Sequence, residues 1–183
     1  DTKTPFENES FFSDSQPSAT PWTGPNWYVN DTYTGADSYT YAGGSDTSYG
    51  IGSPSRPFLT IPMAMSKAAA GDTIWIDAGR YDSYVTITAT ETAGVNIDKD
   101  SITLMGVDSG ATVIDPPGGL VTTDSIYGIY ADTQTGLAIR NLGILGANRG
   151  SYLVNVERSK ISSDSACANT RYGIVLANGS DTT

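Results

Sequence analysis

The sequence contains no histidine and a single cysteine, Cys167. Without histidine there is no Ser-His or Cys-His pair for nucleophilic catalysis, and the commonest general base and metal ligand are both absent. One cysteine cannot form a disulfide within the chain, and it cannot assemble a zinc site with other cysteines or with histidine. Any chemistry therefore depends on carboxylates, tyrosine, lysine or arginine.

Charged side chains and long apolar runs are also scarce. Charged residues make up 16% of the 183 positions, and 20 acidic against 10 basic side chains give a net charge of −10. Such a negative field disfavours binding to nucleic acid and to anionic lipid. No segment approaches the roughly 20 apolar residues of a membrane-spanning helix. The abundant Ser, Thr, Asn, Gly and Tyr favour short strands and tight turns over long helices.

Residues 1–25 form a leader rich in Pro, Ser, Thr and Asp, without helical or strand periodicity. Four prolines interrupt any regular element. Its large aromatic side chains are costly to leave in water, so the leader either folds back over its own domain or docks as an arm on a neighbouring subunit. The candidate assembly residues are Phe6, Phe11, Phe12 and Trp22.

Residues 26–72 have the pattern of an N-terminal cap. A short strand is predicted at residues 26–29, followed by a long polar loop with several tyrosines. Thr60 is a suitable N-cap for a short amphipathic helix that continues to Ala70, and Gly71 is suited to end it. The period of the apolar residues then changes from 3.6 to 2, which indicates a strand from residue 73.

Residues 73–183 alternate short β-rich segments with Gly and Pro turns. Ile139 and Ile161 lie 22 residues apart, and Ile129, Val154 and Ile174 are spaced by 25 and 20. A period near 22 with three strands per repeat predicts an all-β solenoid, a parallel β-helix, in which inward side chains stack from coil to coil. The predicted strands are 73–77, 85–88, 102–105, 112–114, 126–130, 137–139, 144–145, 152–156, 159–162 and 172–176.

A β-sandwich is the main alternative fold. Antiparallel neighbours in a sandwich need hairpin turns, and the Asn-Gly or Asp-Gly signal for such a turn occurs only at Asn178-Gly179. The turn chemistry therefore favours the parallel arrangement.

A series of segments in the cap and just after it forms a set. They are Trp27-Tyr28-Val29, Gly44-Ser45-Asp46, Arg56-Pro57-Phe58-Leu59-Thr60-Ile61, residues 68–74, Ala78-Gly79-Arg80-Tyr81, Val85-Thr86-Ile87 and residues 102–106. Together they resemble the N-terminal cap and first coils of pectate-lyase-like, right-handed parallel β-helix proteins. The resemblance covers roughly residues 26–115. It implies a cap of strand, loop and helix that closes the first coil.

The same resemblance implies little about activity, because lyases, hydrolases, adhesins and structural proteins share this cap. Lyases of the superfamily use a Lys or Arg as base and acidic residues that bind calcium, both on later coils. The basic residues of the later part stand in no matching motif, so no catalytic residue is assigned. They are Arg140, Arg149, Arg158, Lys160 and Arg171.

Two sets of residues are candidate binding sites. Aspartates at or near predicted turns would form a calcium site if stacked turns brought them together, or they are ordinary turn residues that accept bonds from nearby amides. Tyrosines of the cap loop, close to several carboxylates, have the makings of a sugar-binding platform, or they pin the loop against the cap helix. The aspartates are Asp98, Asp100, Asp108 and Asp115, and the tyrosines are Tyr33, Tyr39, Tyr41 and Tyr49.

Three Asn-X-Ser/Thr sequons, at Asn8, Asn30 and Asn178, are candidate glycosylation sites and favour an extracellular or cell-surface location. The predicted core strand at residues 172–176 is followed by only seven residues, so we expect further protein or another subunit to cover the last coil. The preferred hypothesis is a secreted or cell-surface structural or adhesive β-helix protein that self-associates end to end. The alternatives are the N-terminal part of a polysaccharide lyase or hydrolase, and a glycan-binding module. Calcium is the one cofactor and polysaccharide the one further partner that these readings imply.

Overall fold

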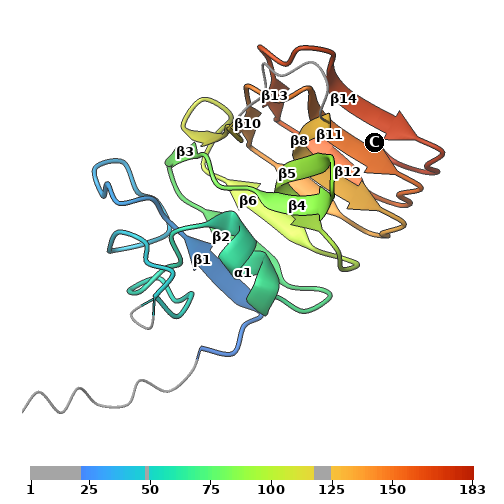
Figure 1. Ribbon diagram of the computed structural model, residues 1–183. Coiled ribbons are helices and arrows are strands. Elements are labelled where there is room, and N and C mark those ends of the chain that lie inside the picture. The colour runs from blue at the N-terminus through green and yellow to red at the C-terminus, as the bar shows by residue number, and fades with distance from the viewer. Residues whose placement is uncertain (1–21, 48–49, 118–124) are drawn as a thin grey trace, which may run out of the picture.

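The described part of the chain is built from short strands and one short helix (Figure 1). The computed structural model describes residues 22–47, 50–117 and 125–183. The elements are β1 Asn26–Val29, α1 Ile61–Lys67, β2 Thr73–Ile76, β3 Gly79–Tyr81, β4 Val85–Thr88, β5 Glu91–Ile97, β6 Thr103–Gly106, β7 Thr112–Ile114, β8 Ser125–Asp132, β9 Ala138–Arg140, β10 Gly143–Ile144, β11 Arg149–Val154, β12 Lys160–Ser162, β13 Ser165–Ala166 and β14 Tyr172–Ala177. The mostly β character predicted from the composition is confirmed.

The strands form three sheets that share a common pattern. The first sheet has the order β1-β2-β6-β9-β12, the second β3-β7-β10-β13 and the third β4-β5-β8-β11-β14. From β6 onward the chain visits the first, second and third sheets in turn, and each pass adds one parallel strand to each. None of the three sheets closes into a barrel. Figure 1 shows the strands of successive passes lying side by side.

Aliphatic rows from the three sheets make up the core. In the first sheet the pairing aligns Ile74, Leu104 and Ile139, all fully buried. Tyr81, Ile114 and Ile144 form the equivalent row of the second sheet, and Ile97, Ala131 and Leu153 that of the third. Each such side chain contributes about 1.5–3 kcal/mol when it is removed from water. These rows hold the passes together.

The pairing tests the predicted register directly. Ile139 and Ile161, 22 residues apart, are partners in β9 and β12, as predicted. The predicted row of Ile129, Val154 and Ile174 is wrong, because Ser151 pairs with Ile129 and with Ile174. Ser151 is a buried polar residue in an inward position, so a search for aliphatic side chains passes over it.

The helix α1 begins as predicted and ends earlier. Thr60 is extended and its hydroxyl accepts from Met63 N, which confirms the N-cap. The helix stops at Lys67 rather than Ala70, because the chain leaves helical geometry at Ala68 and the Ala69 amide donates to Asp72 Oδ2 at 2.8 Å. No helix in the described ranges combines the length and the apolar character needed to cross a membrane.

One antiparallel pair departs from the expected pattern. β4 and β5 form a hairpin through a turn at residues 89–90, which carries no Asn-Gly or Asp-Gly signal. Conversely, Asn178-Gly179 does not make a hairpin, because Ser180 forms a parallel bridge with Glu157. Strands β3, β5 and β13 were not predicted at all. They combine small or polar residues whose burial depends on neighbouring passes.

Turns of left-handed conformation recur at equivalent points of successive passes. Thr133, Asn155 and Asn178 follow the third-sheet strands with φ of 66°, 52° and 54°. Side-chain hydrogen bonds also join residues 22 apart, such as Leu137 N to Ser159 Oγ at 2.9 Å. The repeat therefore includes polar positions as well as the aliphatic rows.

The last strand leaves apolar side chains in contact with solvent. Ile174 and Leu176 on β14 continue the inward rows, yet they are 44% and 47% exposed. The end-to-end association expected from the sequence stays a prediction.

Candidate functional site

A column of glycines determines which side chains reach the outside of the third sheet. Gly94, Gly128 and Gly150 occupy equivalent places in β5, β8 and β11. A Cβ on Gly128 would overlap Ile144 Cγ2 of the second sheet and the Gly150 carbonyl oxygen, so only glycine fits this close approach. The column interrupts the alternation of the strands, and side chains three residues apart then contact each other on one face.

The face created in this way carries three tyrosines. The ring centroids of Tyr127 and Tyr152 are 5.1 Å apart, with an interplanar angle of 12°. Tyr130 lies 5.1 Å from Tyr127 and 6.2 Å from Tyr152. The Arg149 guanidinium lies 4.7 Å from the Tyr152 centroid and 5.5 Å from that of Tyr127, in cation–π geometry. We call Tyr127, Tyr130, Arg149 and Tyr152, together with Glu91, the tyrosine face.

Hydrogen bonds fix the orientation of this group. Tyr127 donates its hydroxyl hydrogen to Glu91 Oε1 at 2.6 Å, and Arg149 Nη1 donates to the Tyr127 hydroxyl oxygen at 3.0 Å. Tyr127 is only 1% exposed, whereas Tyr130, Arg149 and Tyr152 are half-buried. The face thus has one buried tyrosine held between a carboxylate and a guanidinium, with two partly accessible rings beside it.

The electrostatics keep the phenols neutral. Burial raises the pKa of Tyr130 above 10, and the nearby charges of Asp132 and Glu91 raise it further. Neutral phenols can both donate and accept hydrogen bonds. The arrangement therefore offers aromatic surface, hydroxyl groups and one guanidinium, a combination suited to binding rather than to proton abstraction.

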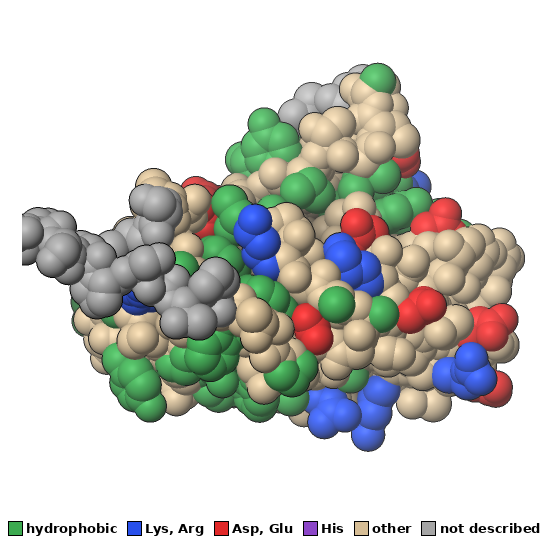
Figure 2. All heavy atoms as spheres, turned by 90° about the horizontal axis from the view of Figure 1, so that it is seen from below, with side chains coloured by type: hydrophobic (Ala, Val, Ile, Leu, Met, Phe, Trp, Pro, Cys, Tyr) green, Lys and Arg blue, Asp and Glu red, His purple; other side chains and the backbone are tan. Residues whose placement is uncertain are grey.

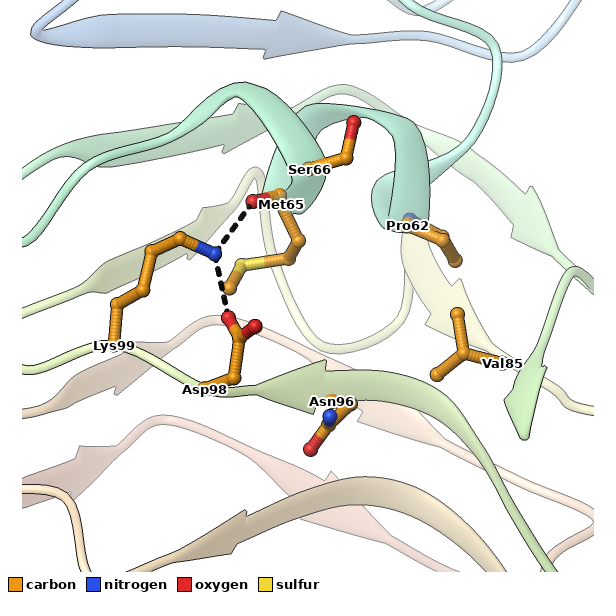
Figure 3. Close-up of a pocket in the computed structure, with 7 residues that line it drawn as sticks. All are labelled: Pro62, Met65, Ser66, Val85, Asn96, Asp98 and Lys99. Atoms are coloured by element: carbon orange, nitrogen blue, oxygen red, sulfur yellow. Dashed lines mark hydrogen bonds and ion pairs between the residues drawn. The ribbon is translucent and has the colours of Figure 1, made fainter. Parts of the chain in front are cut away.

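A small hollow adjoins the same sheet, between α1, β4 and β5 (Figure 3). Its volume is about 180 Å³. Its lining includes Asn96, which stands in the same row as Tyr130 and Tyr152. Lys99 Nζ donates to the Met65 carbonyl oxygen at 3.1 Å and pairs with Asp98, so this lysine caps the end of α1. The hollow extends the row of the tyrosine face toward the cap.

Two further hollows lie around the cap. One, of about 280 Å³, is lined by Trp22, Trp27, Gly50, Ile51, Phe58 and Lys67. The other, of about 140 Å³, is lined by Asp31, Leu59, Thr60, Arg80, Tyr81, Asp82 and Ser83. Trp22 packs edge-on against Tyr28 of its own chain, at 6.3 Å between centroids. The other predicted assembly residues, Phe6, Phe11 and Phe12, lie outside the described residues.

The cap-loop tyrosines predicted to bind sugar have different environments. Tyr33 and Tyr41 are 71% and 84% exposed, and Tyr49 lies outside the described residues. Tyr39 donates to the Gly106 carbonyl oxygen at 2.9 Å and packs edge-on against Trp75, so it anchors the loop. Burial raises the pKa of the Tyr39 phenol, and the charge of Asp77 adds to the effect. Sugar binding by this loop stays a prediction.

The four aspartates predicted to bind calcium each have a local role. Asp98 pairs with Lys99, and Asp115 with Arg80. Asp108 accepts from the amides of residues 110 and 111, and Asp100 from the Thr135 amide. Across the described ranges, no three His, Cys, Asp or Glu side chains converge in a way that could hold a metal ion. These contacts match the alternative interpretation of turn aspartates.

The sequons differ in accessibility. Asn30 is fully buried and uses both hydrogens of its amide inside the cap, so its nitrogen is not available in the folded protein. Asn178 is exposed, and Asn8 lies outside the described residues.

Sequence reasoning missed the tyrosine face, although a signal for it exists. Tyr130 and Tyr152 are 22 residues apart, as are Tyr127 and Arg149. Both spacings equal the repeat given by Ile139 and Ile161. Applying that repeat to aromatic and basic residues would have placed all four on neighbouring strands.

Charged groups are mixed on the face drawn in Figure 2. Basic and acidic side chains are interspersed there among polar surface, and hydrophobic side chains gather toward the cap. A continuous basic track, which a nucleic-acid backbone would require, is not seen on this face.

Comparison with known proteins gives a likeness in fold alone. The sequence matches no protein-family model. It matches no curated protein sequence either. A solved structure of a rhamnogalacturonan lyase is similar, with a TM-score of 0.51 and 14% sequence identity. The match covers 85% of this chain and 51% of the lyase chain, so this chain spans about half of that protein's length. The likeness supports the pectate-lyase-like fold without showing membership of the family.

Proposed function

We propose that this chain is a glycan-binding module that holds a polysaccharide along the tyrosine face. The observation that carries the proposal is the pair of half-exposed rings, Tyr130 and Tyr152, held in place beside Arg149. Aromatic rings pack against the C–H faces of sugars, while hydroxyl and guanidinium groups bond to sugar oxygens. An extracellular location is part of the proposal.

The proposed architecture is a right-handed parallel β-helix. Its support is the repeated visit to three sheets in a fixed order, with one parallel strand added to each sheet per pass. The handedness follows the strong preference for right-handed connections between parallel strands. In such a fold, neighbouring strands lie about 4.8 Å apart. A row across several passes therefore presents contacts at a spacing close to the length of one sugar unit in an extended chain.

The charge distribution favours a neutral sugar over a polyuronate. The chain has a net charge of −10, which opposes the approach of a polyanion. The charge of Arg149 is also linked, through the Tyr127 hydroxyl, to the carboxylate of Glu91. The name of the similar structure points instead to an acidic substrate, so the test includes both kinds of glycan.

The test is binding to an array of neutral and acidic plant and microbial polysaccharides, followed by calorimetry on the best ligand. Tyr152→Ala is expected to weaken binding at least about tenfold, or about 1.4 kcal/mol, whereas Tyr152→Phe keeps most of it. Tyr41→Ala is the matched control, because Tyr41 is 84% exposed in the cap loop.

The outcomes separate the candidate functions. Loss of binding in Tyr41→Ala with none in Tyr152→Ala would move the site to the cap loop. Absence of binding to every glycan would refute the proposal. A rise in ultraviolet absorbance from unsaturated uronate would instead identify a lyase, for which the fold likeness is the present support. Neither the comparison nor the tyrosine face lends support to a structural or adhesive role.

A further inference from the structure

The cap loop is tied to the first coil by one buried carboxylate. Asp77 follows β2 and is fully buried. It accepts from the amides of Ser38, Tyr39 and Thr40 at 2.6–3.0 Å, and from the Thr40 hydroxyl at 2.9 Å. These donors occupy both oxygens of Asp77, so its charge is used entirely in holding the loop.

A second polar pair beside it is incompletely bonded. Asn30 is 0% exposed, and its Nδ2 donates to Asp37 Oδ2 at 2.7 Å and to the Ala42 carbonyl oxygen at 3.0 Å. Because both donors are used, the orientation of the amide is fixed and Asn30 Oδ1 is the atom left over. This oxygen is buried without a hydrogen-bond partner, and so is Asp37 Oδ1.

The two oxygens require a positive or donating group between them. Both are acceptors, so they cannot satisfy each other. Burial raises the pKa of Asp37, and the nearby charges of Asp77 and Asp31 raise it further, although the bond from Asn30 opposes the rise. The surroundings are therefore negative as well as short of donors, and both properties favour a cation over a neutral group.

We propose that one Ca²⁺ ion binds under the cap loop, coordinated by Asn30 Oδ1 and Asp37 Oδ1. The donors are all oxygens, without nitrogen or sulfur, which suits a hard cation. Calcium accepts amide and carboxylate oxygens in irregular geometry and completes its shell with water, whereas Mg²⁺ demands a near-ideal octahedron. Only one or two carboxylates contribute, so the affinity is that of extracellular modules, with a Kd of about 0.1–1 mM.

The test uses the full chain, stripped with a chelator and titrated with CaCl₂ by calorimetry. We expect one ion per chain, and a rise in Tm that NaCl of equal ionic strength does not reproduce. Asp37→Asn is expected to weaken binding at least tenfold. Asp108→Asn is the matched control, because it removes a turn aspartate that accepts only from nearby amides.

A second variant keeps the proposal testable if Asp37→Asn does not fold. Asp31→Asn retains an acceptor for the Tyr33 amide, which Asp31 Oδ1 now binds at 2.7 Å, and removes a neighbouring charge. It should weaken Ca²⁺ binding while leaving the far-ultraviolet spectrum unchanged. Absence of binding heat and of any calcium-specific rise in Tm would mean that buried water satisfies the two oxygens, and would overturn the proposal. Undiminished binding by a folded Asp37→Asn or Asp31→Asn variant would do the same.

Discussion

Asp164 occupies an inward position of the last pass, and its replacement by Asn should stabilise the protein at neutral pH. It is equivalent to Leu142 of the preceding pass, which is fully buried. Asp164 Oδ1 accepts from the Leu142 amide at 2.7 Å, while Oδ2 is buried without a partner. Burial raises the pKa of Asp164 to about 6 from 3.8, against the opposing effect of the Leu142 amide.

The magnitude and the sign follow from this shift. A rise in pKa from 3.8 to about 6 corresponds to about 3 kcal/mol, and solvent that reaches part of the carboxyl reduces this to about 1–2 kcal/mol. The folded state binds the Asp164 proton more tightly than the unfolded chain does. The free energy of unfolding should therefore fall as the pH rises from about 4 to about 6, and level off above that. Asp164→Asn keeps the acceptor for Leu142 and removes the charge.

The assay is urea unfolding followed by far-ultraviolet circular dichroism between pH 4 and pH 7.5. Asp164→Asn should be more stable than the wild type by about 1–2 kcal/mol at pH 7 and equal to it near pH 4. Asp181→Asn removes the same charge from an exposed site on the last pass and serves as the control. A constant difference between Asp164→Asn and the wild type at all pH values would refute the reasoning, as would an equal effect of Asp181→Asn.

Three further substitutions test the packing, a turn and the cap, each by urea unfolding. Gly128→Ala should lower the free energy of unfolding by about 2–3 kcal/mol through steric overlap, while Gly110→Ala, whose Cβ would meet only an aspartate side chain, should cost little; equal effects would count against the glycine column. Thr133→Asn should raise stability by about 1 kcal/mol, because a β-branched residue is strained at φ 66° and the next two passes carry Asn there; no gain would argue against that conformation. Asp77→Asn should cost about 2 kcal/mol or more and expose the cap loop to proteolysis, since amides that bind a carboxylate would lose its charge; an intact, protease-resistant loop would contradict this role.

Local signals in the sequence predicted the parts of the fold that depend on local chemistry. The Thr60 N-cap and the aliphatic strands are examples, because capping and side-chain alternation act over a few residues. Ile139 and Ile161 also gave the correct repeat. The failures lie where a neighbouring pass decides the outcome. Ser151 is inward only because its neighbours surround it, and Gly128 resets the alternation only because Ile144 lies against it.

The candidate sites were harder to predict for the same reason. Tyr127 and Arg149 are remote in sequence and meet only through strand pairing. The bond deficit of Asn30 is likewise invisible in the sequence, where the residue reads as a sequon. Predicting such sites requires the register first, and the register depends on residues such as Ser151 that hydrophobic patterns omit.

The spacing of 22 residues between paired positions has a consequence for how such a chain can change length. Ile139 pairs with Ile161, and Leu137 bonds to Ser159, at the same interval. Duplication or excision of one whole period would keep every remaining ladder aligned, since each period touches only its neighbours. Loss of a single residue would turn the following side chains inside out. Genetic lengthening or shortening of this architecture should therefore proceed in discrete steps of one complete circuit.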